Sequence, residues 1–163
     1  MKAVIQRVTR ARVSVAGEVT GEIGAGALVL LCVQRGDGPA EAKKLAERIA
    51  HFRFFEDAAG RMNLSLLEGT GHGPLPILLV SQFTLAADGR KGRRPSFDQA
   101  EEPSRAREVL ALVREAWLSL GLTVAEGRFG AEMQVELVND GPVTFFLEQA
   151  PAAGPAAPPQ PFT

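Results

Sequence analysis

The sequence contains very few of the side chains that catalytic metals and reactive thiols require. Its 163 residues include one cysteine and two histidines. The single thiol, Cys32, excludes an internal disulfide framework, and its place in the apolar run 28–33 predicts a small buried side chain rather than a reactive one. His51 and His72 have no zinc-site spacing, and we expect both at the surface. We therefore expect no protein-bound metal and no other cofactor.

Common catalytic motifs are absent as well. The chain has no G-x-S-x-G elbow, no G-x-x-x-x-G-K-[ST] loop and no G-x-G-x-x-G turn after a strand. Any enzymatic chemistry must therefore rest on hydroxyls, on backbone groups or on the substrate itself.

Neither the net charge nor the hydropathy pattern indicates a membrane protein or a protein that binds nucleic acid through its overall charge. The net charge is -1, so RNA binding would have to come from a local basic patch. No run approaches about 18 apolar residues, and the first ten residues lack the apolar core of a signal peptide. We expect a cytoplasmic protein with one domain over residues 1–149 and a Pro/Ala-rich tail over residues 150–163 that builds no core.

Hydrophobic periodicity predicts many strands and two amphipathic helices. The strand candidates are residues 2–8, 11–16, 19–23, 27–33, 54–56, 62–64, 77–85, 122–125, 133–137 and 143–147. One helix is expected from Pro39, with Ala42, Leu45, Ala46, Ile49 and Phe52 on its apolar stripe. The other follows Pro103, ends before Gly121 and carries Ala106, Val109, Leu110, Val113, Trp117 and Leu120 on one stripe. Because strands and helices do not alternate regularly, the pattern favours an α+β fold with a mostly antiparallel sheet.

Two neighbouring stretches carry candidate chemistry. The apolar segment 77–85 turns polar within "SQFTL", at Ser81, Gln82 and Thr84. The glycine-containing loop "DGRKGRRPSF" follows, with Arg90, Lys91, Arg93 and Arg94. Such a cluster can pair with phosphates, and a polar strand end beside it suggests a site for a reactive group on a polyanion. The alternatives are a strand that emerges into solvent and a solvated basic loop.

A third stretch, "LVNDGPVTFFLE" (137–148), sets Gly141 and Pro142 between two strand-like segments. Proline cannot donate to a sheet ladder and glycine weakens a strand interior. Asn-Asp-Gly-Pro is rich in turn formers, so a plain turn is the first interpretation.

Five segments together resemble D-aminoacyl-tRNA deacylase, a family of enzymes that remove D-amino acids from mischarged tRNA. The segments are "MKAVIQRVTRARVSV", "MNLSL", "LLVSQFTLAAD", "KGRRPSF" and "FGAEMQVELVNDGPVTFFLE". The likeness runs in order from Met1 to about Glu148, and SQFTL and NDGPVTF are the family's signatures. The loop 68–76, longer and richer in glycine than usual, and the tail depart from the pattern without touching a signature.

The resemblance implies a barrel-like sheet and a homodimer whose active sites lie at the subunit interface, with aminoacyl-tRNA as the partner and no membrane. The family's Gly-Pro peptide is cis and reaches into the neighbouring subunit's pocket. Gly141 and Pro142 are therefore expected to act across the dimer and to select the chirality of the substrate. Arg7 is expected to brace the Gly-Pro loop, although a surface arginine on a strand is the alternative.

The resemblance also implies roles within the pocket. Phe83 and Thr84 would be catalytic, and the substrate would be bound by Ser81, Gln82, Gly130, Ala131 and Met133. Met133 on its own fits ordinary core packing equally well. The four basic residues Arg90, Lys91, Arg93 and Arg94 would hold phosphates of the acceptor end.

The expected reaction is hydrolysis of an activated ester, which needs an oriented water and a stabilised oxyanion. Backbone N–H groups near Phe83 and Thr84 are suitable donors, and the ribose 2′-hydroxyl could position the water. Thr84 as a nucleophile is the alternative, but we find no adjacent base in the sequence to activate it.

Carbonyls of Gly141 and Pro142 that held the α-amino group would make an L side chain collide with backbone. D side chains and glycine would be accepted, so glycyl esters on mischarged tRNA-Ala are expected substrates. Two other functions stay open: a non-catalytic RNA-binding module and a small-ligand or structural β protein.

Overall fold

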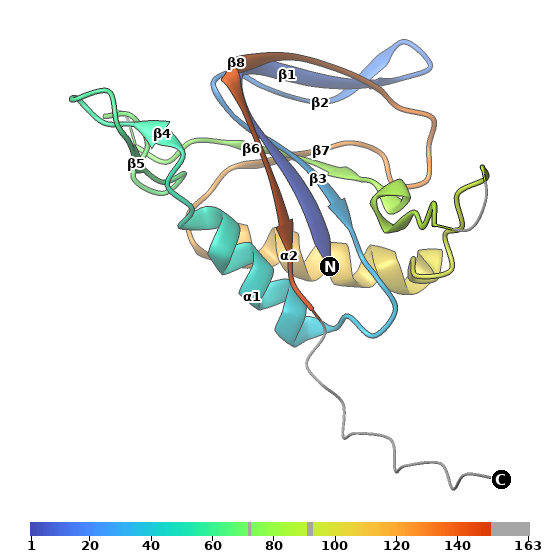
Figure 1. Ribbon diagram of the computed structural model, residues 1–163. Coiled ribbons are helices and arrows are strands. Elements are labelled where there is room, and N and C mark those ends of the chain that lie inside the picture. The colour runs from blue at the N-terminus through green and yellow to red at the C-terminus, as the bar shows by residue number, and fades with distance from the viewer. Residues whose placement is uncertain (72, 91–92, 151–163) are drawn as a thin grey trace, which may run out of the picture.

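The two longest strands, β1 (Lys2–Val15) and β8 (Gln134–Glu148), form the spine of the fold (Figure 1). The computed structural model describes residues 1–71, 73–90 and 93–150. β1 and β8 pair antiparallel from Lys2–Glu148 to Ser14–Gln134. On its other edge β1 pairs antiparallel with β3 (Gly26–Cys32) along its first half and with β2 (Glu18–Ile23) along its second half. Both edges of β1 are therefore covered.

The sheet is mixed and nearly closes on itself. β6 (Ile77–Ser81) joins β3 in parallel and β7 (Val124–Glu126) joins β6 in parallel, which gives the order β2-β1-β3-β6-β7 with β8 also on β1. The two ends of this order approach each other, because a Cβ on Gly21 of β2 would lie 2.4 Å from the carbonyl oxygen of Glu126. The predicted α+β class with a barrel-like sheet and two helices is confirmed.

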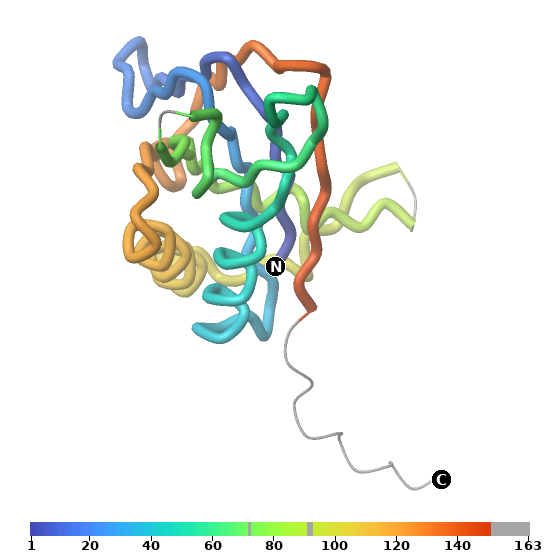
Figure 2. The backbone as a smooth tube through the Cα atoms, turned by 90° about the vertical axis from the view of Figure 1, so that its left-hand side faces the viewer, coloured from blue at the N-terminus to red at the C-terminus, as the bar shows by residue number. Residues whose placement is uncertain are grey.

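Two helices, α1 (Pro39–Ala50) and α2 (Pro103–Ser119), cover one face of the sheet (Figures 1 and 2). Both begin at the predicted prolines, and Gly121 follows the end of α2 with a φ of 85°. The predicted apolar stripes pack into the main core, where the indole N–H of Trp117 donates to the carbonyl of Ala46 at 3.0 Å. A smaller core lies within the curl of the sheet and contains Val8, Ala11, Val13, Leu28, Leu78 and Val80.

A short hairpin and the loop that follows it connect α1 to β6. β4 (Phe55–Glu56) and β5 (Met62–Leu64) form the predicted hairpin as a separate two-stranded sheet. The chain then returns to the main sheet, where Ala27 N–H donates to Pro76 O at 3.1 Å. None of the described helices is both long and apolar enough to span a bilayer.

Several predicted strand boundaries are wrong. Segments 2–8 and 11–16 are one strand, and so are 133–137 and 143–147, because β1 and β8 stay paired across both interruptions. The predicted strand 77–85 ends at Ser81, where the chain turns into the 3₁₀ helix η1 (Phe83–Ala86). β7 begins at Val124 rather than Leu122, which is buried in the main core. The tail predicted from residue 150 lies outside the described residues from 151 onward.

Candidate active site

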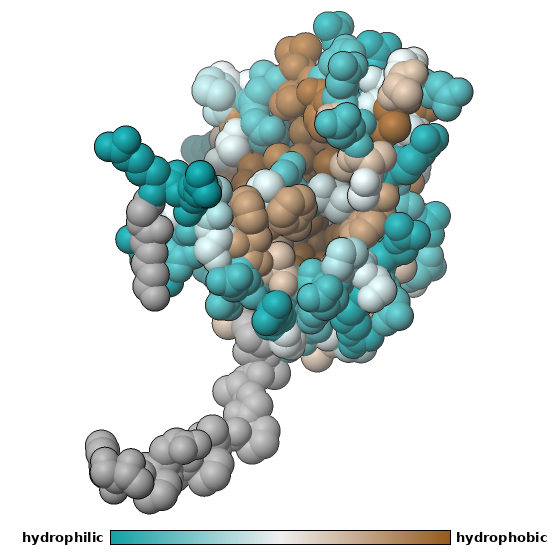
Figure 3. Space-filling view, turned by 90° about the vertical axis from the view of Figure 1, so that its right-hand side faces the viewer, coloured by the Kyte–Doolittle hydropathy of each residue, from teal (hydrophilic) through white to brown (hydrophobic). Residues whose placement is uncertain are grey.

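A cavity of about 490 Å³ opens where β6 ends. Its face of the molecule shows apolar side chains gathered in a hollow with a hydrophilic rim (Figure 3). The cavity brings together six of the predicted site residues, which are Ser81, Gln82, Phe83, Gly130, Ala131 and Met133. Segments 81–83 and 130–133 are distant in sequence, so it is the fold that brings these residues together around the cavity.

The turn from β6 into η1 leaves two backbone donors free. Gln82 N–H makes the last sheet-like bond, to Leu31 O at 2.8 Å, and η1 begins at the next residue. Within the described chain, the N–H groups of Phe83 and Thr84 donate to no other protein group. Adjacent unpaired amides at a cavity rim can stabilise a developing oxyanion.

A buried thiol lies behind this turn. Cys32 is 1% exposed, lines the cavity and contacts the carbonyl oxygen of Phe83 through Sγ at 3.6 Å. Burial raises the pKa of the Cys32 thiol, which keeps it protonated and able to donate. The predicted burial of this cysteine is confirmed, and its lack of reactivity stays a prediction.

Thr84 does not line the cavity, and its side chain is exposed. Its hydroxyl accepts a hydrogen bond from the side-chain amide of Gln82. An amide nitrogen is a donor and cannot remove a proton, so this contact orients the hydroxyl without activating it as a nucleophile.

The segment after β7 forms the opposite wall. Gly127 N–H donates to Leu79 O at 2.9 Å, which ties the segment to β6. A Cβ on Gly127 would lie 2.6 Å from Sδ of Met133, so this glycine gives the methionine its space. Met133 also packs on the smaller core, so its side chain lies both in the core and in the lining of the cavity.

Sequence reasoning missed the third wall of the cavity. It comes from α2 and the segment before Gly130, through Ala106, Leu110 and Phe129. Ala106 and Leu110 belong to the predicted apolar stripe of α2, and such a stripe looks the same whether it faces core or cavity. The aromatic Phe129 beside the family-like Gly130 was the one available signal.

Gly141 and Pro142 lie outside this cavity, on an exposed bulge of β8. Between the pairs Val8–Asn139 and Gln6–Thr144, β1 advances two residues (8 to 6) while β8 advances five (139 to 144). Residues 140–143 therefore stand opposite the single residue Arg7. The Gly141-Pro142 peptide bond is cis, and the strand continues on both sides, so the plain-turn interpretation is wrong.

Side chains at the base of the bulge hold its shape. The Asn139 side chain accepts from Val143 N–H at 2.7 Å and donates to Thr144 Oγ1 at 3.2 Å. Arg7 is 6% exposed and donates to Asp140 O at 3.2 Å and to Phe54 O at 2.9 Å. Arg7 therefore contacts the bulge as predicted and is not a surface arginine.

The basic loop leaves η1 and projects from the body of the protein (Figure 2). Arg90 is engaged within the loop, because its guanidinium binds both carboxylate oxygens of Asp88 at 2.6–3.1 Å. The hydrogen bonds from Arg90 lower the pKa of Asp88 to about 2. Arg93 and Arg94 are exposed, and Lys91 lies outside the described residues.

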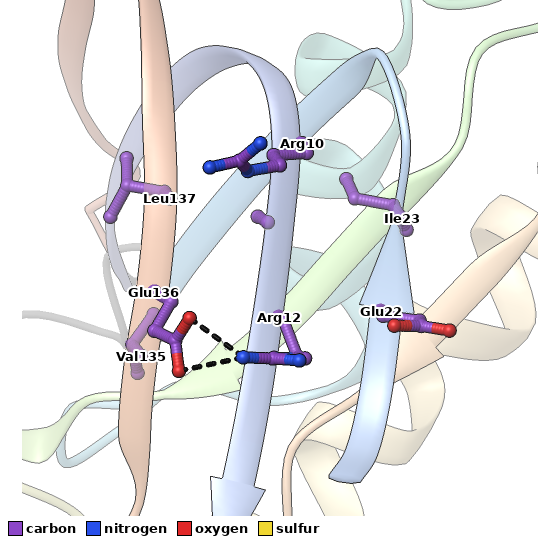
Figure 4. Close-up of a pocket in the computed structure, with 8 residues that line it drawn as sticks. Arg10, Arg12, Glu22, Ile23, Val135, Glu136 and Leu137 are labelled. Carbon is purple, nitrogen blue, oxygen red and sulfur yellow. Dashed lines mark hydrogen bonds and ion pairs between the residues drawn. The ribbon is translucent and has the colours of Figure 1, made fainter.

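A larger open hollow, of about 720 Å³, lies over β1, β2 and β8 (Figure 4). None of the predicted site residues lines it. Two of its four charged side chains are paired across strands, since Arg12 binds both oxygens of Glu136 at 2.8–2.9 Å. We therefore place the chemistry in the smaller cavity.

The remaining sequence candidates for chemistry lie elsewhere or are undescribed. His51 is exposed at the end of α1, and His72 lies outside the described residues. Among the residues that the structure describes, no three His, Cys, Asp or Glu side chains gather as metal ligands.

Comparison with known proteins gives consistent matches over nearly the whole chain. The family model described as D-Tyr-tRNA(Tyr) deacylase matches residues 4–148. A D-aminoacyl-tRNA deacylase from Idiomarina loihiensis is 53% identical over 91% of this chain and 99% of its own length. Another, from Syntrophotalea carbinolica, is 54% identical over 91% of this chain and 97% of its own length.

Two solved structures share the fold. The c-Myc DNA unwinding element binding protein has a TM-score of 0.83 at 38% identity and covers 92% of this chain and 99% of its own. A probable eukaryotic D-amino acid tRNA deacylase has a TM-score of 0.74 at 17% identity, over 90% of this chain and 97% of its own.

Proposed function

Since the chain belongs to the D-Tyr-tRNA(Tyr) deacylase family and is a D-aminoacyl-tRNA deacylase, we propose that it works at a site that two identical subunits share. One subunit supplies the cavity and the amides of Phe83 and Thr84. The other supplies the bulge that carries Gly141 and Pro142.

The reaction is hydrolysis of the ester that joins the amino acid to the terminal ribose. The oxygen of a water molecule bonds to the ester carbonyl carbon, and the bond from that carbon to the ribose oxygen breaks. The ribose oxygen takes a proton, and the amino acid leaves as a free acid. Because the ester is activated, the protein needs only to orient the water and stabilise the oxyanion.

The observation that carries this proposal is a pair of N–H groups, of the cavity-lining Phe83 and of its neighbour Thr84, that donate to no other group among the described residues. They are fixed by backbone geometry, so they can donate to the oxyanion without reorganisation. The Thr84 hydroxyl, held by Gln82, positions the substrate or the water rather than attacking the ester. The ribose 2′-hydroxyl beside the ester would assist in placing the water.

The bulge of β8 is suited to select chirality by exclusion. Its carbonyls would accept hydrogen bonds from the substrate α-amino group and point an L side chain into backbone. Backbone depends on no rotamer, and here the Arg7 and Asn139 contacts hold it in place. Glycine has no side chain to exclude, so glycyl esters on mischarged tRNA-Ala are accepted as well.

The outer face of β8 supports the homodimer. Val138 and Phe146 are 41% and 55% exposed and flank the bulge in sequence. Apolar side chains that gather in a contiguous exposed patch are typical of a protein interface, and we propose that these two belong to one. A second copy seated there would cover both side chains and receive Gly141 and Pro142 in its cavity.

The direct test measures hydrolysis of matched D- and L-aminoacyl-tRNA. We expect the D ester to be cleaved faster by more than about 200-fold, beyond what a pocket of fitting shape achieves for a small apolar difference. Mass spectrometry during turnover should find no acyl group on Thr84. Equal cleavage of both isomers would contradict chiral exclusion, and the RNA-binding and structural alternatives predict cleavage of neither.

The domain limits 1–149 and a cytoplasmic location, where charged tRNA is used, are part of the same proposal. Arg93 and Arg94 are proposed to contact acceptor-end phosphates, together with Lys91 and with Arg90 once its pair with Asp88 is displaced.

A further inference from the structure

A second hollow, of about 280 Å³, adjoins the active-site cavity. The two share Ser81, Leu110 and Phe129 in their linings, so a common wall of side chains divides them. The charged residues that line the second hollow are Arg107 and Arg114 of α2 and Glu126 of β7. Nothing in the proposed chemistry above uses it.

The two arginines differ in how their charge is balanced. Arg114 is paired, with Nε 2.8 Å from Oε2 of Glu126 and a second contact to Glu115, although the N–H of Nε is not directed at the Glu126 carboxylate as in a hydrogen bond. Within the described part of the chain, no carboxylate lies within ion-pair distance of Arg107. The adjacent Glu108 pairs with Arg105 instead. Among the described residues, therefore, no ion pair balances the charge of Arg107.

Arg107 is nonetheless held in place, by the aromatic ring that divides the two hollows. Its Cζ lies 4.9 Å from the centroid of the Phe129 ring, a cation–π contact. The side chain is exposed and its guanidinium donors remain available to a ligand. A fixed, unpaired guanidinium beside a cavity fits a phosphate or carboxylate group.

The covalent structure of the substrate decides between these anions. If the ester carbonyl lies at the amides of Phe83 and Thr84, the terminal ribose occupies the active-site cavity. The RNA chain must leave that cavity through the 5′ phosphate of its terminal nucleotide. The second hollow lies just across the shared wall, so it is within reach of that phosphate.

We infer that Arg107 binds a backbone phosphate of the tRNA 3′ end and so sets the position of the terminal ribose, an inference that rests on the proposed function. It adds a phosphate contact on α2, separate from the basic loop after η1. Arg90 in that loop must first give up Asp88, whereas Arg107 has no such competitor among the described residues.

The test compares Arg107→Gln with Arg105→Gln, which removes the same charge from the same helix two positions away. Binding of uncharged tRNA is titrated across salt concentrations, so the result for Arg107 does not depend on hydrolysis. We expect Arg107→Gln to raise the Kd about 5- to 10-fold and to lower the salt slope by about 0.7, one phosphate of a single strand. Arg105→Gln should leave both close to wild type.

A shortened tRNA that lacks its last three nucleotides locates the contact. On this RNA, wild type and Arg107→Gln should bind alike, because the phosphate that Arg107 contacts is gone. A Kd and salt slope of Arg107→Gln equal to those of Arg105→Gln on full tRNA would overturn the inference. An equal defect on full and shortened tRNA would overturn it too. The proposed function fails separately, if the wild type does not prefer the D ester.

Discussion

Arg7 and Arg12 lie on the same strand and make very different contacts. Arg7 is almost fully buried and donates to two main-chain carbonyls from different parts of the fold, Phe54 O and Asp140 O. Arg12 makes a two-oxygen pair with Glu136, but its side chain is 46% exposed and that of Glu136 62%. Water can replace the contacts of Arg12, but it cannot reach the buried bond from Arg7 to Phe54 O in the same way.

We therefore predict that Arg7→Met lowers the free energy of unfolding by about 2–3 kcal/mol, because it leaves the buried carbonyl of Phe54 and the partly buried carbonyl of Asp140 without this donor. Arg12→Met should change it by less than about 1 kcal/mol, as is usual for an exposed pair. Urea denaturation of both variants measures the difference. Equal losses would show that Arg7 does not brace the bulge.

At the level of single residues, prediction succeeded where the neighbouring sequence determines whether a side chain is buried. The apolar run around Cys32 predicted its burial, because few small thiols in such runs reach solvent. The apolar stripe of α2 did not show whether Leu110 lies in the core or lines the cavity, because such a stripe indicates only which side of the helix faces inward. Met133 shows both environments at once.

Among the elements, the bulge of β8 depends most on one glycine. Gly141 has a φ of 141°, and a Cβ there would lie 2.5 Å from Cγ2 and 2.8 Å from the nitrogen of Val143. Any side chain must therefore move the peptide groups that are proposed to meet the substrate.

We expect Gly141→Ala to lower kcat/KM for D-aminoacyl-tRNA by at least about 10-fold, as misplaced positioning groups do. Gly17→Ala is the matched control, since Gly17 also has a positive φ, of 85°, but no atom within 4 Å of an added Cβ. Its kcat/KM should stay within about twofold of wild type. Steady-state kinetics decide, and equal effects of the two substitutions would count against a role for the bulge.

The basic loop contains its own counter-charge. The pKa of Asp88 is lowered from 3.8 to about 2 by hydrogen bonds from Arg90, so the pair is intact at neutral pH. Because that pKa is depressed in the fold, the pair is lost only as the pH falls from about 4 toward 2. Mild acid therefore does not free Arg90.

Asp88→Asn should free Arg90 at neutral pH and tighten tRNA binding about threefold, with a steeper salt slope. Asp98→Asn removes the same charge beside Ser96, from a carboxylate with no arginine partner within the described loop, and should change the Kd less. Titration of both variants with tRNA measures this. Identical Kd changes would mean that Arg90 contributes no phosphate contact.

Strand boundaries were the least predictable part of the elements. Residues 9–10 interrupt the alternation of β1, and Gly-Pro interrupts β8, so each strand was predicted as two pieces. Arg10 in the first interruption pairs with Val138, the second interruption stands opposite Arg7, and the ladder resumes beyond the bulge. The continuity of both strands depends on pairing between distant segments, and the local sequence pattern carries no information about that pairing.

At the scale of the whole molecule, the two predicted halves of the active site are separate features of a single chain. The cavity is lined by Phe83, the first residue of η1, whereas no residue of the bulge of β8 lines it. Composition and periodicity predicted the α+β class. The two halves of the site were predicted from the family resemblance, through the SQFTL and NDGPVTF signatures. A shared site needs a second subunit, which the pattern of one chain cannot show.

Mixing two defective subunits tests this shared site most directly. Phe83→Pro removes one proposed oxyanion donor at the first residue of η1, where proline is tolerated, and Gly141→Ala distorts the bulge. Each homodimer should be nearly inactive on D-aminoacyl-tRNA. After unfolding together and refolding, the mixture should recover about a quarter of wild-type activity, because half of the dimers are mixed and each has one intact site. A mixture no more active than its two components would contradict a site built from two subunits.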